Sequence, residues 1–151
     1  MTFENPVFTT YVIAATLMII KMMGQGWMTV QRMMKVGGGF LNPEDKGKGW
    51  ANPNPRPGQL DADDYVERSR RMHRNDTENI PVFLVAGLLF ALTGPPLWVA
   101  QCLFFGYVAT RLAHFWAYFT AKPHEIRATF FSVGSLIVIG MAIYTFIYAV
   151  A

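Results

Sequence analysis

The chain has 151 residues, of which 52% are hydrophobic and 15% are charged, and its formal net charge is +3. Soluble domains average roughly 25% charged residues, so this composition excludes an ordinary soluble protein, and the length predicts one domain over residues 1–151. Two segments, residues 79–110 and 128–151, contain no Asp, Glu, Lys or Arg. Each is longer than the roughly 20 residues with which a helix crosses a bilayer, which predicts an integral membrane protein.

Four membrane-spanning helices are predicted, which makes the fold class all-α, an integral membrane four-helix bundle. The first is expected at about residues 6–34, and the second runs from the charged segment ERSRRMHRNDTEN (67–79) to about residue 92. The segment TGPP (93–96) separates the second helix from the third, because proline has no N–H group and clashes with the preceding turn. The third helix is expected at about residues 97–119 and the fourth at about 125–149.

The connection at residues 37–64 is rich in Gly, Pro, Asn and Asp, which favour turns. A mobile cytoplasmic loop is expected here, except for FLNPED (40–45). Outside the helix interiors, Lys and Arg lie only in or beside the first and third connections. By the positive-inside rule these connections are cytoplasmic and both termini are not. An endoplasmic reticulum membrane and a bacterial inner membrane fit this multi-pass topology equally.

Two of the predicted helices carry polar side chains at positions i, i+3 and i+7, which share one helix face: Arg71, Arg74 and Glu78 on the second, and Arg111, His114 and Tyr118 on the third. Asn75 adjoins the first set, and Arg127 opens the fourth helix at the same depth. Polar groups in a membrane span are costly and usually face the bundle interior or a water-filled cavity. The pattern predicts an electropositive cavity for a small polyanion whose ammonium group pairs with Glu78.

Simpler interpretations compete with this one. Arg111 could pair with Glu78 as a structural bridge between two helices, since intramembrane charges often pair with one another. His114 taken alone is typical of a packing residue. Arg68 and Arg70 are interpreted as a face that contacts lipid headgroups, and Lys21 either extends to the interface or pairs. The three histidines are scattered through the chain, so no zinc-binding spacing is present.

Three motifs go further: VERSRRMHRNDTENIPVFLVAGLLFALTG (66–94), FLNPED (40–45) and RLAHFWAY (111–118). The first resembles the signature of the membrane-associated proteins in eicosanoid and glutathione metabolism, the MAPEG family. The other two resemble the F-x-N-P-E-D and R-x-x-H-x-x-x-Y motifs of the branch that contains the microsomal glutathione transferase and the microsomal prostaglandin E synthase. The motifs occur in the family's order and span nearly the whole chain.

This resemblance implies a homotrimer of four-helix subunits with a glutathione site between neighbouring subunits, near the cytoplasmic face. Together with the helical spacing, it gives an expected glutathione-binding set of Arg32, Arg71, Arg74, Asn75, Glu78, Arg111, His114, Tyr118, Arg127 and Phe131. Arg127 would also be catalytic, because a cation beside the sulfur favours the thiolate of a thiol whose ordinary pKa is near 8.5. Asp45 matches the family's loop aspartate, expected to assist proton movement. Its alternative role is to stabilise the turn in NPED.

Two details favour the transferase over the synthase within this branch. Ala128 follows Arg127, where the synthases have serine, and NDTEN (75–79) resembles the transferase. The expected function is a membrane-bound glutathione transferase that uses glutathione as co-substrate against an apolar electrophile from the bilayer. Peroxidase activity toward lipid hydroperoxides is also expected. A glutathione-dependent prostaglandin E synthase-like isomerase is the alternative, and a non-enzymatic lipid-binding scaffold is a third reading. Membrane lipids are expected partners, and neither a metal nor nucleic acid is expected to bind.

Overall fold

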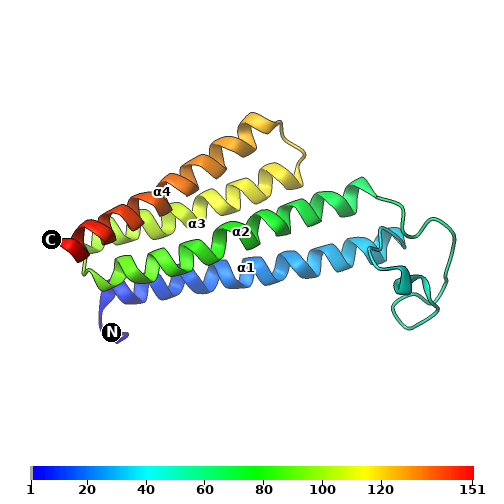
Figure 1. Ribbon diagram of the computed structural model, residues 1–151, viewed down its shortest axis with the longest axis horizontal. Helices are drawn as coiled ribbons and strands as arrows, with labels where there is room; N and C mark the ends of the chain where they lie inside the picture. Colours follow the sequence, from blue (N-terminus) through cyan, green and yellow to red (C-terminus); the bar gives the residue numbers. More distant parts are fainter. Residues whose placement is uncertain (1) are drawn as a thin grey trace.

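The computed structural model describes residues 2–151, and over these residues the chain is all-helical. Four long helices are formed: α1 (Pro6–Val36), α2 (Asp64–Leu92), α3 (Leu97–Phe119) and α4 (His124–Val150), with a short 3-10 helix η1 (Pro43–Lys46) in the first connection. Figure 1 shows the long helices running lengthwise beside one another, with both termini at one end and the first connection projecting from the other. The predicted all-α fold with four helices is confirmed.

Local signals explain where the helices begin and end. Asn5 caps α1 by accepting hydrogen bonds from the backbone N–H groups of Val7 (2.9 Å) and Phe8 (3.1 Å), and Gly37 ends the helix in the left-handed conformation with φ 60°. Asp63 caps α2 in the same way as Asn5. This cap explains why α2 begins at Asp64 rather than at about residue 67. Within residues 2–151, α1 and α4 are long and apolar enough to cross a membrane.

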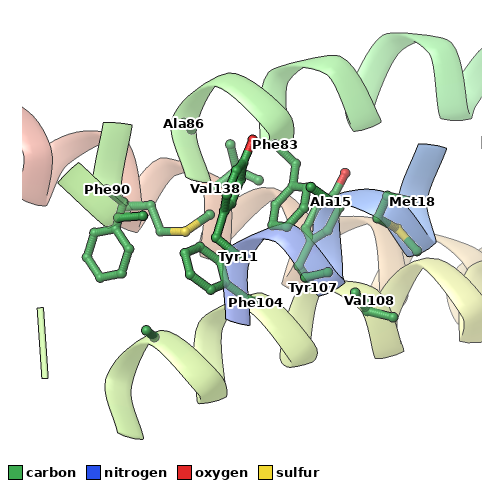
Figure 2. Close-up of a cluster of buried hydrophobic side chains, with 14 of the residues drawn as sticks. Tyr11, Ala15, Met18, Phe83, Ala86, Phe90, Phe104, Tyr107, Val108 and Val138 are labelled. Carbon is green, nitrogen blue, oxygen red and sulfur yellow. The ribbon is translucent and has the colours of Figure 1, made fainter. Parts of the chain in front are cut away.

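Aromatic side chains from three helices fill the centre of the bundle. Figure 2 shows Tyr11 of α1, Phe83 of α2, and Phe104 and Tyr107 of α3 packed together. The rings of Phe83 and Tyr107 stack with centroids 4.0 Å apart, and the Tyr11 hydroxyl donates to the carbonyl of Leu84 at 2.8 Å. Such contacts fix how far each helix is rotated and shifted against the next. They thereby set which side chains of α2 and α3 face each other closer to the end of the bundle that carries the first connection.

The first connection is folded back onto the end of α1. Arg56 donates to the carbonyl of Val36 at 2.6 Å, and Gln59 donates to that of Gly37 at 3.1 Å. Buried Asn52 and Gln59 exchange two hydrogen bonds of 2.9 and 3.0 Å. These hydrogen bonds satisfy the buried amides, so this part of the connection packs against α1; its mobility stays a prediction.

Arg70 also anchors this connection. It is mostly buried, pairs with Glu67 and donates to the carbonyl of Gly39. The interpretation of Arg70 as part of a face toward lipid headgroups is therefore wrong, because its guanidinium is engaged by partners within the chain.

Candidate functional site

A buried cluster of charges joins three helices beneath the aromatic core. One carboxylate oxygen of Asp76 on α2 forms an ion pair with the ammonium group of Lys21 on α1. The other accepts a hydrogen bond of 2.6 Å from the guanidinium of Arg111 on α3. The side chains of Asp76 and Arg111 are each 1% exposed. Buried charges of this kind persist only when they are paired. This Lys21–Asp76–Arg111 cluster therefore ties the three helices together at one depth.

The cluster corrects one sequence-based alternative. A structural bridge from Arg111 does exist, but its partner is Asp76 rather than Glu78, which is exposed. Lys21 pairs inside the bundle, which is one of the two roles considered for it. Arg111 also donates to the side-chain oxygen of Asn75 at 2.6 Å. The cluster is thus in direct contact with one of the expected glutathione-binding residues.

Beside Asn75 lies a cavity of about 210 Å³ between α2, α3 and the start of α4. Its wall brings together five of the expected site residues with two further ones: Asn75, His114, Tyr118, Arg127 and Phe131, with His124 and Ala128. His114 and Tyr118 come from one face of α3, and their ring centroids are 5.0 Å apart. The i, i+4 spacing on α3 therefore places both side chains at one cavity.

Arg127 is the cation of this cavity. Its guanidinium carbon lies 4.5 Å from the ring centroid of Tyr118, a cation–π contact. Among residues 2–151 it forms no ion pair, and its buried Nε has no hydrogen-bond partner. Arg127 also lies in the first turn of α4, where the helix dipole adds partial positive charge. The arrangement leaves an uncompensated cation, with a spare donor, facing a small cavity.

A second cavity of about 210 Å³ adjoins the first and shares Tyr118 and Arg127 with it. Its other polar lining residues are Arg68, Arg71 and Lys122, and no carboxylate lines it. The two cavities together form an electropositive recess where α2 meets the α3–α4 turn. Such a recess attracts anions, and guanidinium groups can bind carboxylates through two hydrogen bonds.

The remaining expected site residues lie elsewhere in the chain. Arg74 and Glu78 are exposed on α2 and line neither of these cavities. Arg32 is 3% exposed, donates to the carbonyl of Tyr65 at 2.8 Å, and stacks over the Tyr65 ring at 4.1 Å. Arg32 thus braces α1 against the start of α2.

Asp45 is exposed in η1 and accepts from the Asn42 amide at 3.2 Å, as expected for a side chain that stabilises the NPED turn. It lines a separate cavity of about 510 Å³ with Trp27, Met33 and Trp50. Figure 1 shows η1 beside the end of α1, away from the α3–α4 turn that precedes Arg127. Asp45 and Arg127 of the same chain therefore do not share a cavity.

Sequence reasoning missed Asp76 as the partner of Lys21 and Arg111, and it missed His124. Helical register would have indicated Asp76, because Met72, Ile80 and Phe83 lie four before, four after and seven after it, and all are buried. His124 carried a weaker signal. It precedes Arg127 by three positions, so both lie on one face of α4.

Comparison with known proteins places these motifs in context. The chain matches the MAPEG family over residues 9–147. It is 39% identical to microsomal glutathione S-transferase 1 of Bos taurus and 38% identical to that of Homo sapiens, each over 92% of this chain and 88% of the relative. It is 33% identical to prostaglandin E synthase of Homo sapiens, over 93% of this chain and 88% of the relative.

Proposed function

Because this chain belongs to the MAPEG family, we propose that it is a membrane-bound glutathione transferase. In this proposal Arg127 stabilises the thiolate of bound glutathione, and the sulfur attacks the electrophilic carbon of an apolar substrate from the bilayer. A carbon–sulfur bond forms, the leaving group departs as an anion, and the thiol proton passes to solvent. The observation that carries the proposal is the unpaired guanidinium of Arg127 in a cavity with Tyr118 and His114.

The two cavities divide the recognition of glutathione between them. The cavity with Asn75, His114 and Tyr118 is apolar on the Phe131 side and suits the cysteine portion of the tripeptide. The second cavity, with Arg68 and Arg71, suits the carboxylates of glutathione, because cations line it and no carboxylate of the protein does. The Tyr118 hydroxyl and the imidazole of His114 provide polar contacts between these two ends.

We further propose that the active protein is a homotrimer whose sites lie between subunits. Arg74 and Glu78 are exposed and form no ion pair among residues 2–151, although polar groups at membrane depth need partners. A neighbouring subunit would complete their environment, and Glu78 would then receive the ammonium group of glutathione. Asp45 and Arg32 line cavities that do not include Arg127 of the same chain, so in this proposal they approach the sulfur bound in a neighbouring subunit.

The electrophile enters from the hydrocarbon phase along α4. Phe131, an exposed apolar side chain of this helix, lines the cavity, and an apolar substrate partitions into the hydrocarbon layer. Lipid hydroperoxides are a second substrate class in this proposal. Two glutathione molecules would reduce one hydroperoxide to an alcohol and water, and would leave as the disulfide. Four membrane spans with both termini on the non-cytoplasmic side complete the proposed topology.

A prostaglandin E synthase-like isomerase is the second candidate, favoured by the similarity to prostaglandin E synthase of Homo sapiens. In an isomerase glutathione would be regenerated in each cycle rather than consumed. Ala128 lines the cavity next to Arg127 with a methyl group, so the serine hydroxyl that the family resemblance implies for the synthases is missing there. This difference supports the transferase.

The experiment measures two products with purified protein in phospholipid nanodiscs. The protein is given glutathione with either an aryl halide or a prostaglandin endoperoxide, and the products are analysed by mass spectrometry. The proposal expects a glutathione conjugate of the aryl compound, with glutathione consumed in equal amount. Isomerised endoperoxide without glutathione consumption would favour the second candidate. Glutathione binding with neither product would favour a scaffold.

A further inference from the structure

Asn75 is the contact between the buried charge cluster and the cavity. Its side-chain oxygen accepts from Nη2 of Arg111 at 2.6 Å, and the residue lines the cavity beside His114 and Tyr118. A carboxamide can present either its oxygen or its NH₂ group to a neighbour, and the two orientations have almost the same shape. The partner on the protein side therefore decides which group faces a ligand.

The chemistry of Arg111 removes this ambiguity. A guanidinium carries only donors and stays charged at any physiological pH, so it can contact only the oxygen of Asn75. The Nδ2 group of Asn75 is then left for the cavity, and it has no hydrogen-bond partner among residues 2–151. A donor fixed in this way selects an acceptor oxygen on the ligand, such as a peptide carbonyl or a carboxylate.

Arg111 is itself held in place by the carboxylate of Asp76. The same Nη2 donates to Asp76 at 2.6 Å, and Asp76 is tied to α1 through Lys21. Arg111 does not line the cavity. We infer that Arg111, clamped by Asp76, is a positioning residue that fixes the Asn75 carboxamide with its NH₂ toward an acceptor oxygen of glutathione. This inference rests on the proposed function and assigns Arg111 an indirect role in place of direct glutathione contact.

Two variants with matched charge separate positioning from stability. Arg111→Gln and Lys21→Gln each remove one cation from Asp76 and leave it one oppositely charged partner. Glutamine at position 111 offers both a donor and an acceptor, so the orientation of Asn75 is no longer imposed. Lys21 does not contact Asn75, so Lys21→Gln leaves that orientation intact. A third variant, Arg111→Lys, keeps a group that only donates.

The measurement is the Kd for glutathione by equilibrium dialysis in nanodiscs, with the thermal midpoint of each variant recorded beside it. Arg111→Gln is expected to raise the Kd about fivefold, the change that the loss of one ordinary hydrogen bond gives. Lys21→Gln and Arg111→Lys are expected to stay within about twofold of the unsubstituted protein. Both glutamine variants are expected to lower the thermal midpoint, because each weakens the buried cluster.

Each outcome decides the matter. Equal rises in Kd for the two glutamine variants, or a lysine variant that binds glutathione as weakly as Arg111→Gln, would overturn the positioning role.

If Arg111→Gln does not assemble, Asn75→Asp decides, because aspartate keeps an acceptor toward Arg111 and presents only acceptors to the cavity. We expect it to weaken glutathione binding at least tenfold, and an unchanged Kd would overturn the inference. An unsubstituted protein that binds no glutathione would overturn the proposed function and this inference with it.

Discussion

Replacing Arg127 by alanine tests the electrostatic role of this residue. A thiolate about 4 Å from a guanidinium gains about 4 kcal/mol at an effective dielectric constant of about 20. Arg127 is only half-buried, so solvent and salt screen part of this attraction. About 1.4–2.7 kcal/mol of thiolate stabilisation should remain after screening. Removing the cation loses this stabilisation, so the pKa of the bound thiol should rise by about 1–2. The helix dipole of α4 persists in the variant and prevents a larger change.

The sign of the pH dependence follows from the thiol. A raised pKa means that the thiolate, the reactive form, appears only at higher pH. Arg127→Ala should therefore conjugate aryl halides about tenfold more slowly at pH 7, and it should recover as the pH rises through the new pKa. Arg127→Lys keeps the charge but loses the planar fork, so its effect should be smaller. The affinity for glutathione should fall less than the turnover rate, because Asn75 and the cations of the second cavity are retained.

The assay is a pH titration of the ultraviolet absorbance of bound thiolate, recorded beside the pH–rate profile. Lys122→Ala is the matched control, because Lys122 lines the neighbouring cavity with Arg127 but not the cavity of Ala128 and Phe131. It removes the same charge nearby and should change the thiol pKa little. If Arg127→Ala leaves both the titration and the rate profile unchanged, Arg127 is an interfacial anchor and the thiolate assignment fails.

Three further predictions concern binding, stability and assembly. Tyr118→Phe and His114→Ala should each weaken glutathione binding by roughly 0.5–1.5 kcal/mol without disturbing assembly; normal binding in both variants, measured by equilibrium dialysis, would make this face purely structural. Asp76→Ala leaves Lys21 and Arg111 as buried cations without a carboxylate, so we expect a loss of about 3–5 kcal/mol in stability; an unchanged thermal midpoint in detergent would refute this. Native mass spectrometry of the solubilised protein should show a trimer, and a stable, fully active monomer would refute the shared site.

The sequence was sufficient to predict the helices and part of the site. The long charge-free segments predict membrane helices, and the prolines of TGPP (93–96) place the boundary between two of them. The spacing of His114 and Tyr118 on α3 places them on one helix face, and both line one cavity; their role in binding stays a prediction. Arg127 could be added because it opens the next helix at the same depth. These predictions needed only local geometry, which a single sequence contains.

The partner of Arg111 was harder to predict because two carboxylates lie close together on α2. Asp76 and Glu78 are two positions apart, which is about 200° around a helix, so only one of them can face Arg111. The apolar register of Met72 and Ile80 places Asp76 on the buried side. The spacing of Arg71 and Arg74 instead favours Glu78 as the partner, which lies on the exposed side of α2. Weighing the apolar pattern above the charge pattern would have identified the pair.

Contacts between distant segments could not be predicted from local patterns. The packing of the first connection depends on Asn52, Arg56 and Gln59 meeting the end of α1. No periodicity connects these residues. The same holds for Asp45, whose distance from Arg127 depends on how α1 and α4 are arranged in the bundle and, in the proposed trimer, on a neighbouring subunit. Motif matching assigned it a role without that geometry.

Titration of the unsubstituted protein with glutathione tests the central claim most directly. Purified protein in nanodiscs is mixed with glutathione at pH 7, and the ultraviolet absorbance of thiolate is followed before and after an aryl halide is added. The proposed function predicts that thiolate absorbance appears on binding, because free glutathione with a thiol pKa near 8.5 is mostly protonated at this pH. The absorbance should then disappear as the conjugate forms. Bound glutathione that shows no thiolate absorbance and yields no conjugate would contradict the claim that this site activates the sulfur.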